Sequence, residues 1–307
     1  QAAAGLASRV KSIVNSQVGN FYGSNNESVG IGGVAEALNL IEHDSKKLVL
    51  KTNPMQDFLI FRFDQVRDLV QLNTKVTSIN SSGEKVLLKV ALEGGGEEEI
   101  EANKVIVTVP LSILKKNLIS FSPGLPGAMT SAMGKLGMDH SIRVVIDFKK
   151  NFWGESAAFL WGGESFPNCF SCGIGRSEFN QTLSITINGP KAVELSAQGP
   201  DMINTILAEL DEIYSGQATL FVRRDFNTNE VLSIIQDWGK DEFIQGGYSY
   251  PMASATVADR ESLGQPIGSK LFFAGEATDI TGNAGTINGA LASAERVAEE
   301  VIKSITG

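Results

Sequence analysis

The sequence of 307 residues is 42% hydrophobic and 20% charged, which is typical of a folded globular protein and excludes a disordered or fibrous chain. Its formal net charge of −9 argues against a nucleic-acid partner, because a phosphate backbone is bound by a basic surface. No stretch approaches about 18 uninterrupted apolar residues, so we expect no transmembrane helix.

The N-terminal part of the chain predicts helices. QAAAGLASRVKSIVNS has an amphipathic pattern and no initiator Met. In VGIGGVAEALNLI, Gly30, Gly32 and Ala35 fit the phosphate-binding pattern G-x-G-x-x-A. The polar stretch FYGSNNES stands where a buried strand should precede such a loop, and no acidic residue follows at the expected distance. We therefore interpret this segment as a helical region and not as a phosphate loop.

Alternating and β-branched runs follow. Val70 to Ile79 and Lys85 to Leu92 flank the turn NSSGE and predict a β-hairpin. A third strand is expected in EEEIEANKVIVTVP, where residues 105–109 have the composition of a strand covered on both faces. The two prolines of SFSPGLPG interrupt the pattern, and we take this segment as the crossing point between two domains.

The next block mixes strands and helices. Ser141 to Phe148, AAFLW, TLSITING and ATLFVRR all have strand-like composition. The segment 193–213 is amphipathic from Pro200 onward and predicts a helix with Gly199 and Pro200 at its start. Together these elements predict a mixed sheet-and-helix layer.

The only two cysteines, Cys169 and Cys172, form a CFSC pair. Such a pair fits a redox dithiol, half of a zinc site, two idle thiols or one local disulfide. A zinc site needs four ligands, and His43 and His140 are distant and lack ligand spacing. We therefore expect no metal, and favour idle thiols or one local disulfide.

The segment LFFAGEATDITGNAGTINGALASAE combines a short strand, a loop of small residues and a helix. Leu271 to Ala274 form the strand, Gly275 permits close approach of a ligand to the backbone, and Glu276 is polar. The helix begins near Thr286, and its free N–H groups suit a phosphate or the N1/O2 edge of a reduced flavin. A dinucleotide site and an ordinary tight strand-to-helix connection both fit this pattern.

Motifs in one consistent order resemble the flavin-dependent amine oxidases, the family of polyamine oxidases, monoamine oxidases and lysine-specific histone demethylases. They are VQLNTKVTSI with KVIVTVPLSILKKNLISFSPGLP, HSIRVVIDFKKNFWG, DWGKDEFIQGGYSYP and LFFAGEAT with GTINGALASAE. The resemblance implies FAD as cofactor. It also implies oxidation of a small-molecule amine by hydride transfer to flavin N5, with reoxidation by dioxygen to hydrogen peroxide. Polyamine-like substrates are slightly favoured.

The resemblance also assigns site residues. Tyr248 matches one side of the aromatic cage that steers the amine, and Thr286 stands at the opposite cage position. Arg143 stands where the family has a lysine near flavin N5, and these three are the implied catalytic residues. The implied cofactor-binding residues are Val76, Trp238, Phe243, Gly275, Glu276, Gly285, Thr286 and Ile287.

Two departures from the family pattern leave the function open. Arg143 cannot shuttle protons as a lysine does, because a guanidinium stays protonated. The family's N-terminal GxGxxG segment is missing, so we expect a second polypeptide to carry that half, or the sequence to be part of a longer protein. The alternative function is a degenerate, non-catalytic subunit that serves as a structural or interaction protein.

The expected fold is α/β, or α+β mixed, with an incomplete FAD-binding domain of amine-oxidase type and a mixed-sheet substrate domain. Residues 1–61 and 119–251 are assigned to the substrate-binding domain. Residues 62–118 and 252–307 are assigned to the discontinuous FAD-binding domain.

Overall fold

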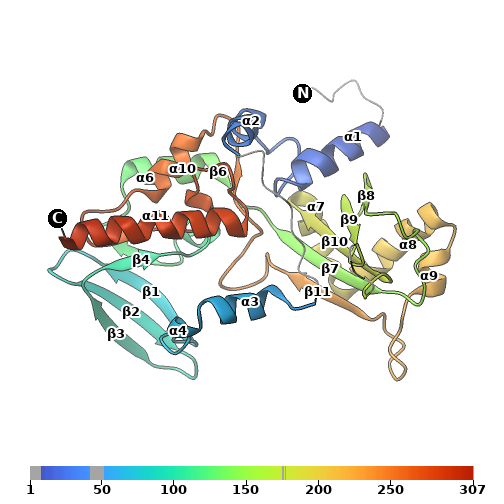
Figure 1. Cartoon of the computed structure of the whole chain (residues 1–307), viewed down its shortest axis with the longest axis horizontal. Coiled ribbons are helices and arrows are strands. Elements are labelled where there is room, and N and C mark those ends of the chain that lie inside the picture. Colours follow the sequence, from blue (N-terminus) through green and yellow to red (C-terminus); the bar gives the residue numbers. More distant parts are fainter. Residues whose placement is uncertain (1–7, 42–51, 175, 177, 307) are drawn as a thin grey trace.

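The computed structural model describes residues 8–41, 52–174, 176 and 178–306. Figure 1 shows two regions side by side, one around a five-stranded sheet and one beneath the long C-terminal helix α11 (Ile287–Thr306). The mixed α/β architecture agrees with the expected fold class. Within the described residues, no helix is both long and apolar enough to cross a membrane.

The five-stranded sheet has the antiparallel order β11-β7-β10-β9-β8. Ile142, Val144 and Ile146 alternate along the interior strand β7 and have no exposed surface, so the sheet face on which they lie is covered there. Helices α7 and α8 supply Leu195, Ile206 and other side chains of that core. The strands are β7 (Ser141–Asp147), β8 (Phe159–Trp161), β9 (Asn168–Ser171), β10 (Thr182–Asn188) and β11 (Ser233–Asp237).

One of the two predictions for the helical part of this region is confirmed and the other is wrong. Helix α7 spans Pro190–Ser196, and α8 (Met202–Tyr214) follows a 3-10 turn at Gly199–Asp201, as predicted. The strand expected at ATLFVRR is wrong, because α9 (Gln217–Phe221) occupies that stretch. Ala218 and Val222, four residues apart, are both buried in the core. This spacing places both on one helical face, which overrides the β propensity of the segment.

The other region contains a four-stranded sheet of order β3-β2-β1-β5. The predicted hairpin is confirmed: β1 (Thr74–Asn80) pairs antiparallel with β2 (Val86–Leu92). The prediction of one third strand in EEEIEANKVIVTVP is wrong, because this segment forms two strands. Strand β3 (Glu97–Ala102) pairs with β2, whereas β4 (Val105–Val107) pairs with β13 (Leu271–Phe273). The glutamates of β3 are exposed, and charged residues are typical of an edge strand. The strand β5 spans Ser120–Ser122.

Helices pack around these strands. They are α5 (Leu111–Lys115), α6 (Gly127–Lys135), α10 (Val257–Gly264) and α11. Gly289, Ser293 and Val297 recur every fourth residue on the buried face of α11, and Val297 packs on Phe272 of β13. The short strands β6 (Leu136–Gly137) and β12 (Tyr250–Pro251) pair beside them.

The hydrophobic cores suggest a later domain crossing than SFSPGLPG. Met129, Met133 and Leu136 pack with the core of β1 and β13, whereas Ile142 packs in the core of the five-stranded sheet. We therefore propose that the chain first crosses between Met138 and Ser141, and that residues 119–138 belong with the FAD-binding region.

The N-terminal segment lies against both regions. It contains α1 (Ser8–Asn15), a π-helical turn at Ser16–Asn20, and α2 (Ile31–Leu40). Asn20 holds the end of β10 through two hydrogen bonds with Asn188, of 2.7 Å each. The segment with Gly30 and Gly32 enters α2, and Gly30 N–H donates to Pro251 O at 2.7 Å. The helical interpretation of this segment therefore agrees with the structure.

Helices α3 (Met55–Arg62) and α4 (Asp64–Arg67) have no buried residue. Their apolar side chains are instead solvent-exposed, including Phe61 at 84% and Val66 at 50%, and Leu69 and Leu72 beyond them are both 77% exposed. Exposed apolar stretches of this length are typical of surfaces that contact another part of a protein or a partner.

Candidate functional site

A cavity of about 270 Å³ opens where β4 and β13 end. In open parallel sheets, ligands bind outside the carboxyl ends of the strands. The walls are mainly apolar, and Glu276 is the charged residue among them. The lining residues are Val107, Thr108, Val109, Pro110, Leu111, Leu114, Met138, Ile244, Gly247, Leu263, Phe273, Ala274, Gly275, Glu276, Ala277, Thr278 and Ala290.

Gly275 follows β13 directly and has a φ of 125°, a conformation that favours glycine. A Cβ built on it would find no heavy atom nearer than Thr108 O at 3.9 Å. The space beside Gly275 is therefore open, so a ligand in the cavity can reach this backbone. Its N–H is held by Ser293 Oγ of α11 at 2.9 Å.

The Glu276 carboxylate links three segments of the chain. It accepts hydrogen bonds from Ser249 N–H at 2.9 Å, Ser249 Oγ at 2.7 Å and Gly285 N–H at 2.6 Å. Arg260, which is buried, donates to Ser249 Oγ at 2.7 Å. Burial lowers the pKa of Arg260, and the Glu276 and Asp279 charges oppose that shift. This carboxylate thus fixes the loop before α11 against the cavity wall.

Helix α11 begins beside the cavity with free donors. Thr286 Oγ1 accepts the N–H of Gly289 at 3.1 Å, as an N-cap side chain does. Gly285 N–H is bound to Glu276, but the N–H groups of Thr286 and Ile287 have no hydrogen-bond partner among the residues the structure describes. Two exposed N–H groups at the positive end of a 20-residue helix can donate hydrogen bonds to an anionic group or to the carbonyl edge of a ligand.

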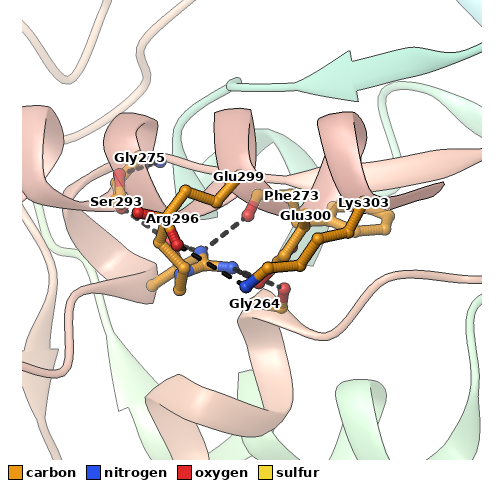
Figure 2. A network of polar contacts seen from close by, with 9 residues as sticks. Gly264, Phe273, Gly275, Ser293, Arg296, Glu299, Glu300 and Lys303 are labelled. Carbon is orange, nitrogen blue, oxygen red and sulfur yellow. Dashed lines mark hydrogen bonds and ion pairs between the residues drawn. The ribbon is translucent and has the colours of Figure 1, made fainter. Parts of the chain in front are cut away.

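Arg296 holds α11 in this position, as Figure 2 shows. Its guanidinium donates to Phe273 O at 2.9 Å, Gly264 O at 3.2 Å and Glu300 at 2.8 Å. It thereby ties α11 to the last residue of β13 and to the end of α10. The start of the helix is fixed relative to the carboxyl end of the parallel pair.

Tyr248 contacts both the loop before α11, at Gly285, and the five-stranded sheet, at Asn188. Its hydroxyl donates to Phe21 O at 2.7 Å and accepts from Asn188 Nδ2 at 3.2 Å. A Cβ built on Gly285 would lie 3.0 Å from Cδ2 of its ring, so glycine is needed there for close contact. Burial raises the pKa of Tyr248 to about 12, so the phenol stays neutral at physiological pH.

Arg143 lies on the face of β7 opposite the hydrophobic core. Its Nη1 donates to Ser184 Oγ at 3.3 Å, and its guanidinium lies 5.5 Å from the centroid of Phe170. Burial lowers its pKa, while electrostatic interaction with Tyr248 opposes the shift.

The structure brings Gly275, Glu276, Gly285, Thr286 and Ile287 together with Tyr248 at the junction of the two regions. Their predicted roles in binding remain proposals.

Of the eight predicted cofactor-binding residues, two, Gly275 and Glu276, are among the residues that line the cavity. Gly285, Thr286 and Ile287 are tied to its wall through the hydrogen bond from Gly285 to Glu276, and the other three lie elsewhere. Val76 packs in the β1 core, and the backbone N–H of Trp238 bonds to Ser141 O at 2.9 Å. Phe243 is 58% exposed, with Lys75 Nζ 5.8 Å from its ring centroid, and the neighbouring Ile244 lines the cavity.

Sequence reasoning missed Ser249 and Arg260, which organise Glu276. Ser249 stands next to Tyr248 in GGYSYP, so its place in that motif could have identified it as a site residue. Arg260 lies in an ordinary helix with no motif that indicates its role.

The cysteine pair is split between the two faces of the sheet. Cys169 is buried in the core, whereas Cys172 follows β9 on the face that carries Arg143. Both thiols are free, so the local disulfide considered from the sequence does not form.

The comparisons with known proteins agree on one family. The family model described as "Flavin containing amine oxidoreductase" matches residues 55–302. Lysine-specific histone demethylase 1 homolog 3 of Arabidopsis thaliana is 30% identical over 233 residues, which are 74% of this chain and 14% of that protein. Probable polyamine oxidase 4 of the same plant is 30% identical over 217 residues, 69% of this chain and 40% of that protein.

Solved structures share the fold. Cyclohexylamine oxidase from Brevibacterium oxydans IH-35A superposes with a TM-score of 0.72 at 18% identity, covering 96% of this chain and 64% of that one. Wild-type putrescine oxidase bound to putrescine gives 0.64 at 21% identity, covering 81% and 53%. The chain thus spans less than two thirds of each, and none of these matches supports a separate second polypeptide. A match over residues 55–302, with a flavin as the cofactor of that family, shows that this chain belongs to the flavin-containing amine oxidoreductases.

Proposed function

We propose that the protein takes part in the FAD-dependent oxidation of an amine. The observation that carries this proposal is the cavity at the carboxyl ends of β4 and β13, with open backbone at Gly275 and with the start of α11 tied to its wall through the hydrogen bond from Gly285 to Glu276. Any helix begins with N–H groups that lack intrahelical partners, so the open cavity beside Gly275 is the feature that distinguishes this site from an ordinary strand-to-helix connection.

These residues fit a flavin cofactor. The apolar walls suit a planar ring system, and Gly275 leaves room for close approach of its chain of hydroxyl groups. The N–H groups of Thr286 and Ile287 would hold the electron-rich edge of the ring. Glu276 acts through the loop that it fixes, because Ser249 and Gly285 already occupy its oxygens.

Bound FAD would supply the redox chemistry, accepting a hydride from the carbon next to the amine nitrogen and passing its electrons to dioxygen to give hydrogen peroxide. The chain's own residues bind and orient the amine. The Tyr248 ring offers an apolar wall and attraction for a cation, and the hydrogen bonds of its hydroxyl with Phe21 O and Asn188 Nδ2 hold it in place. Arg143 adds a fixed positive charge, so we assign it to binding and not to proton transfer.

The substrate class stays a prediction. Polyamine-like amines follow from the resemblance, and the relatives include a probable polyamine oxidase. A non-catalytic role is the second candidate, and Arg143 favours it because arginine replaces the family's lysine near flavin N5.

The direct test is the visible spectrum of the protein purified from its natural source, followed by anaerobic addition of amines. We expect flavin absorption that bleaches on amine addition and returns with air, with release of hydrogen peroxide. A colourless protein would contradict the proposal and support the non-catalytic alternative.

Ile287→Pro tests the cofactor contact itself. Proline at the first position of a helix removes one N–H at little cost to stability, because that N–H has no partner in the helix. We expect flavin affinity to fall by up to about 10-fold, the value of one hydrogen bond. The matched variant Ile287→Ala keeps the N–H and should bind as the wild type does. Equal affinity of the two variants would exclude this contact.

A further inference from the structure

A buried turn of the N-terminal segment, residues 16–24, contacts the side chain of Tyr248. It begins with the π-helical turn Ser16–Asn20, and Ser16, Asn20 and Ser24 are at most 1% exposed. Such π-helical turns are rare in proteins and occur frequently at functional sites. The turn precedes residues 55–302, which match the family model, so its role needs an explanation of its own.

Asn20 binds the end of strand β10. Its Oδ1 accepts the N–H of Asn188 at 2.7 Å, and its carbonyl oxygen accepts Asn188 Nδ2 at 2.7 Å. Its own Nδ2 donates to Thr186 O at 3.1 Å. Both asparagines are buried, and a buried polar group that loses its partner destabilises the folded state. The pair therefore fixes the N-terminal turn on the end of the strand.

Asn188 connects this pair to Tyr248. Its Nδ2 also donates to the Tyr248 hydroxyl at 3.2 Å, whereas its Oδ1 is buried without a hydrogen-bond partner among the described residues. Turning the amide round would place Oδ1 against the carbonyl oxygen of Asn20, and two acceptors repel each other. The side chain thus uses its donors and leaves its acceptor unpaired. A buried group left unpaired in this way needs a reason, and binding of the Tyr248 hydroxyl supplies one.

The Tyr248 side chain is held at its hydroxyl and at its ring edge. The hydroxyl donates its one proton to Phe21 O at 2.7 Å, so it cannot donate to a ligand while this bond lasts. A Cβ built on Gly23, which has a φ of 101°, would lie 3.1 Å from Cε2 of the ring. The ring edge therefore contacts the N-terminal turn closely, as it contacts Gly285 on the loop before α11.

We propose that Asn20 and Asn188 are positioning residues for Tyr248, and that the turn of residues 16–24 is part of the amine-binding site. Tyr248 then acts on the amine through its ring, as an apolar and cation-attracting surface, and not through proton transfer at its hydroxyl. The neighbouring Gly247 lines the cavity, so a shift of Tyr248 also shifts the cavity wall. The inference rests on the proposed amine oxidation, because that function gives Tyr248 its contact with an amine.

The position of the Tyr248 ring can be measured without any activity, by 19F NMR of the protein labelled with 3-fluorotyrosine. The chain has four tyrosines, and Tyr248→Phe identifies the Tyr248 signal. We expect Asn20→Ala and Asn188→Ala each to shift this signal and to leave that of Tyr214, on α8, unchanged. Asn180→Ala is the matched control, because Asn180 is an exposed asparagine just before the other end of β10, and it should move neither signal. A Tyr248 signal that stays in place in both test variants overturns the inference.

Oxidation of putrescine tests the consequence for the reaction. Asn188→Ala and Tyr248→Phe should each raise KM by about 3- to 10-fold, the value of one hydrogen bond, with kcat changed by less than about 2-fold. The double variant should raise KM no more than Asn188→Ala alone, because both changes remove the same hydrogen bond. Effects on KM that multiply in the double variant, or a loss confined to kcat, would overturn the inference.

The two measurements separate this inference from the proposed function. If the protein oxidises no amine, the proposed function fails, and a Tyr248 signal that moves in both variants still supports the N-terminal turn as the element that positions this ring. If putrescine is oxidised and both the signal and KM stay at their wild-type values, the inference fails and the proposed function stands. Asn188→Ala carries the test if Asn20→Ala does not fold.

Discussion

The two sheets that flank the site differ in how completely they are packed. The five-stranded sheet uses residues 141–237 alone, and the side chains on its core face, such as Ile142 and Ile185, are fully buried. The parallel pair β4 and β13 joins segments far apart in the sequence, and Ile106 in its first strand is 47% exposed. Parallel strands normally lie in larger sheets that are covered on both faces.

This difference indicates which region contributes most to the folding stability of the protein and which region has surface left for further contacts. The five-stranded sheet is a self-contained packing unit, whereas the apolar surface of β4, α3 and α4 is exposed to further contacts. The cavity lies on the less complete side. We therefore expect stability changes to be largest in the five-stranded sheet and smallest on α3.

The largest effect is expected for Phe148→Ala. Phe148 has no exposed surface and contacts the rings of Phe152 and Trp153, with centroids 5.1 Å and 5.5 Å away. Its truncation leaves a cavity and should lower the free energy of unfolding by about 3–5 kcal/mol. Urea unfolding followed by tryptophan fluorescence measures this, because Trp153 lies beside the site. A loss below about 1 kcal/mol would contradict tight packing of this core.

Arg296→Met should have the next largest effect. It leaves the carbonyls of Phe273 and Gly264 without their donor, at a cost of about 1–3 kcal/mol. Lys303→Met is the control on the same helix, since the Lys303–Glu299 pair is exposed and 3.6 Å apart, worth about 0–1 kcal/mol. Similar losses in both variants would mean that the network of Figure 2 does not anchor α11.

We predict that burial of the Tyr248 hydroxyl makes the folding stability of the protein depend on pH in the alkaline range. Its pKa is raised from 10.0 to about 12, so the folded state retains the proton that the unfolded state loses first. The contribution is complete below pH 10 and is lost as pH rises through 12. The melting temperature of Tyr248→Phe should therefore fall less than that of the wild type over this range. Parallel curves for the two proteins would contradict burial of the phenol.

The smallest effect is expected for Phe61→Ala on α3. Phe61 is 84% exposed, so the same truncation that damages the core at Phe148 should change stability by less than about 0.5 kcal/mol here. Urea unfolding under identical conditions gives the comparison. A loss near that of Phe148→Ala would show that α3 is covered in solution.

Strong local patterns made much of the fold predictable. The alternation from Ser141 to Phe148 specified β7, and the spacing after Pro200 specified α8. The failures arose where tertiary contacts decide. The ATLFVRR stretch is helical at its start because Ala218 packs in the core, and the acidic and apolar parts of residues 97–107 divide between two sheets.

The site was predictable where it is contiguous in sequence. The LFFAGEAT segment placed Gly275 and Glu276 at the cavity, but Phe243 lies outside it on the surface. Arg260 could not be assigned, because its contact with Ser249 depends on segments brought together only by folding. Its neighbours in sequence have no motif that distinguishes a buried arginine from a surface one.

The pairing of β4 with β13 has a consequence for how the chain folds. All strands of the five-stranded sheet lie between these two segments, so their contacts are more local and can form first. Closing β13 onto β4 then costs less chain entropy, because the intervening residues are already compact. Since β13 and α11 follow every strand of the five-stranded sheet along the chain, they leave the ribosome after that sheet, and the cavity beside β13 forms after the sheet can fold.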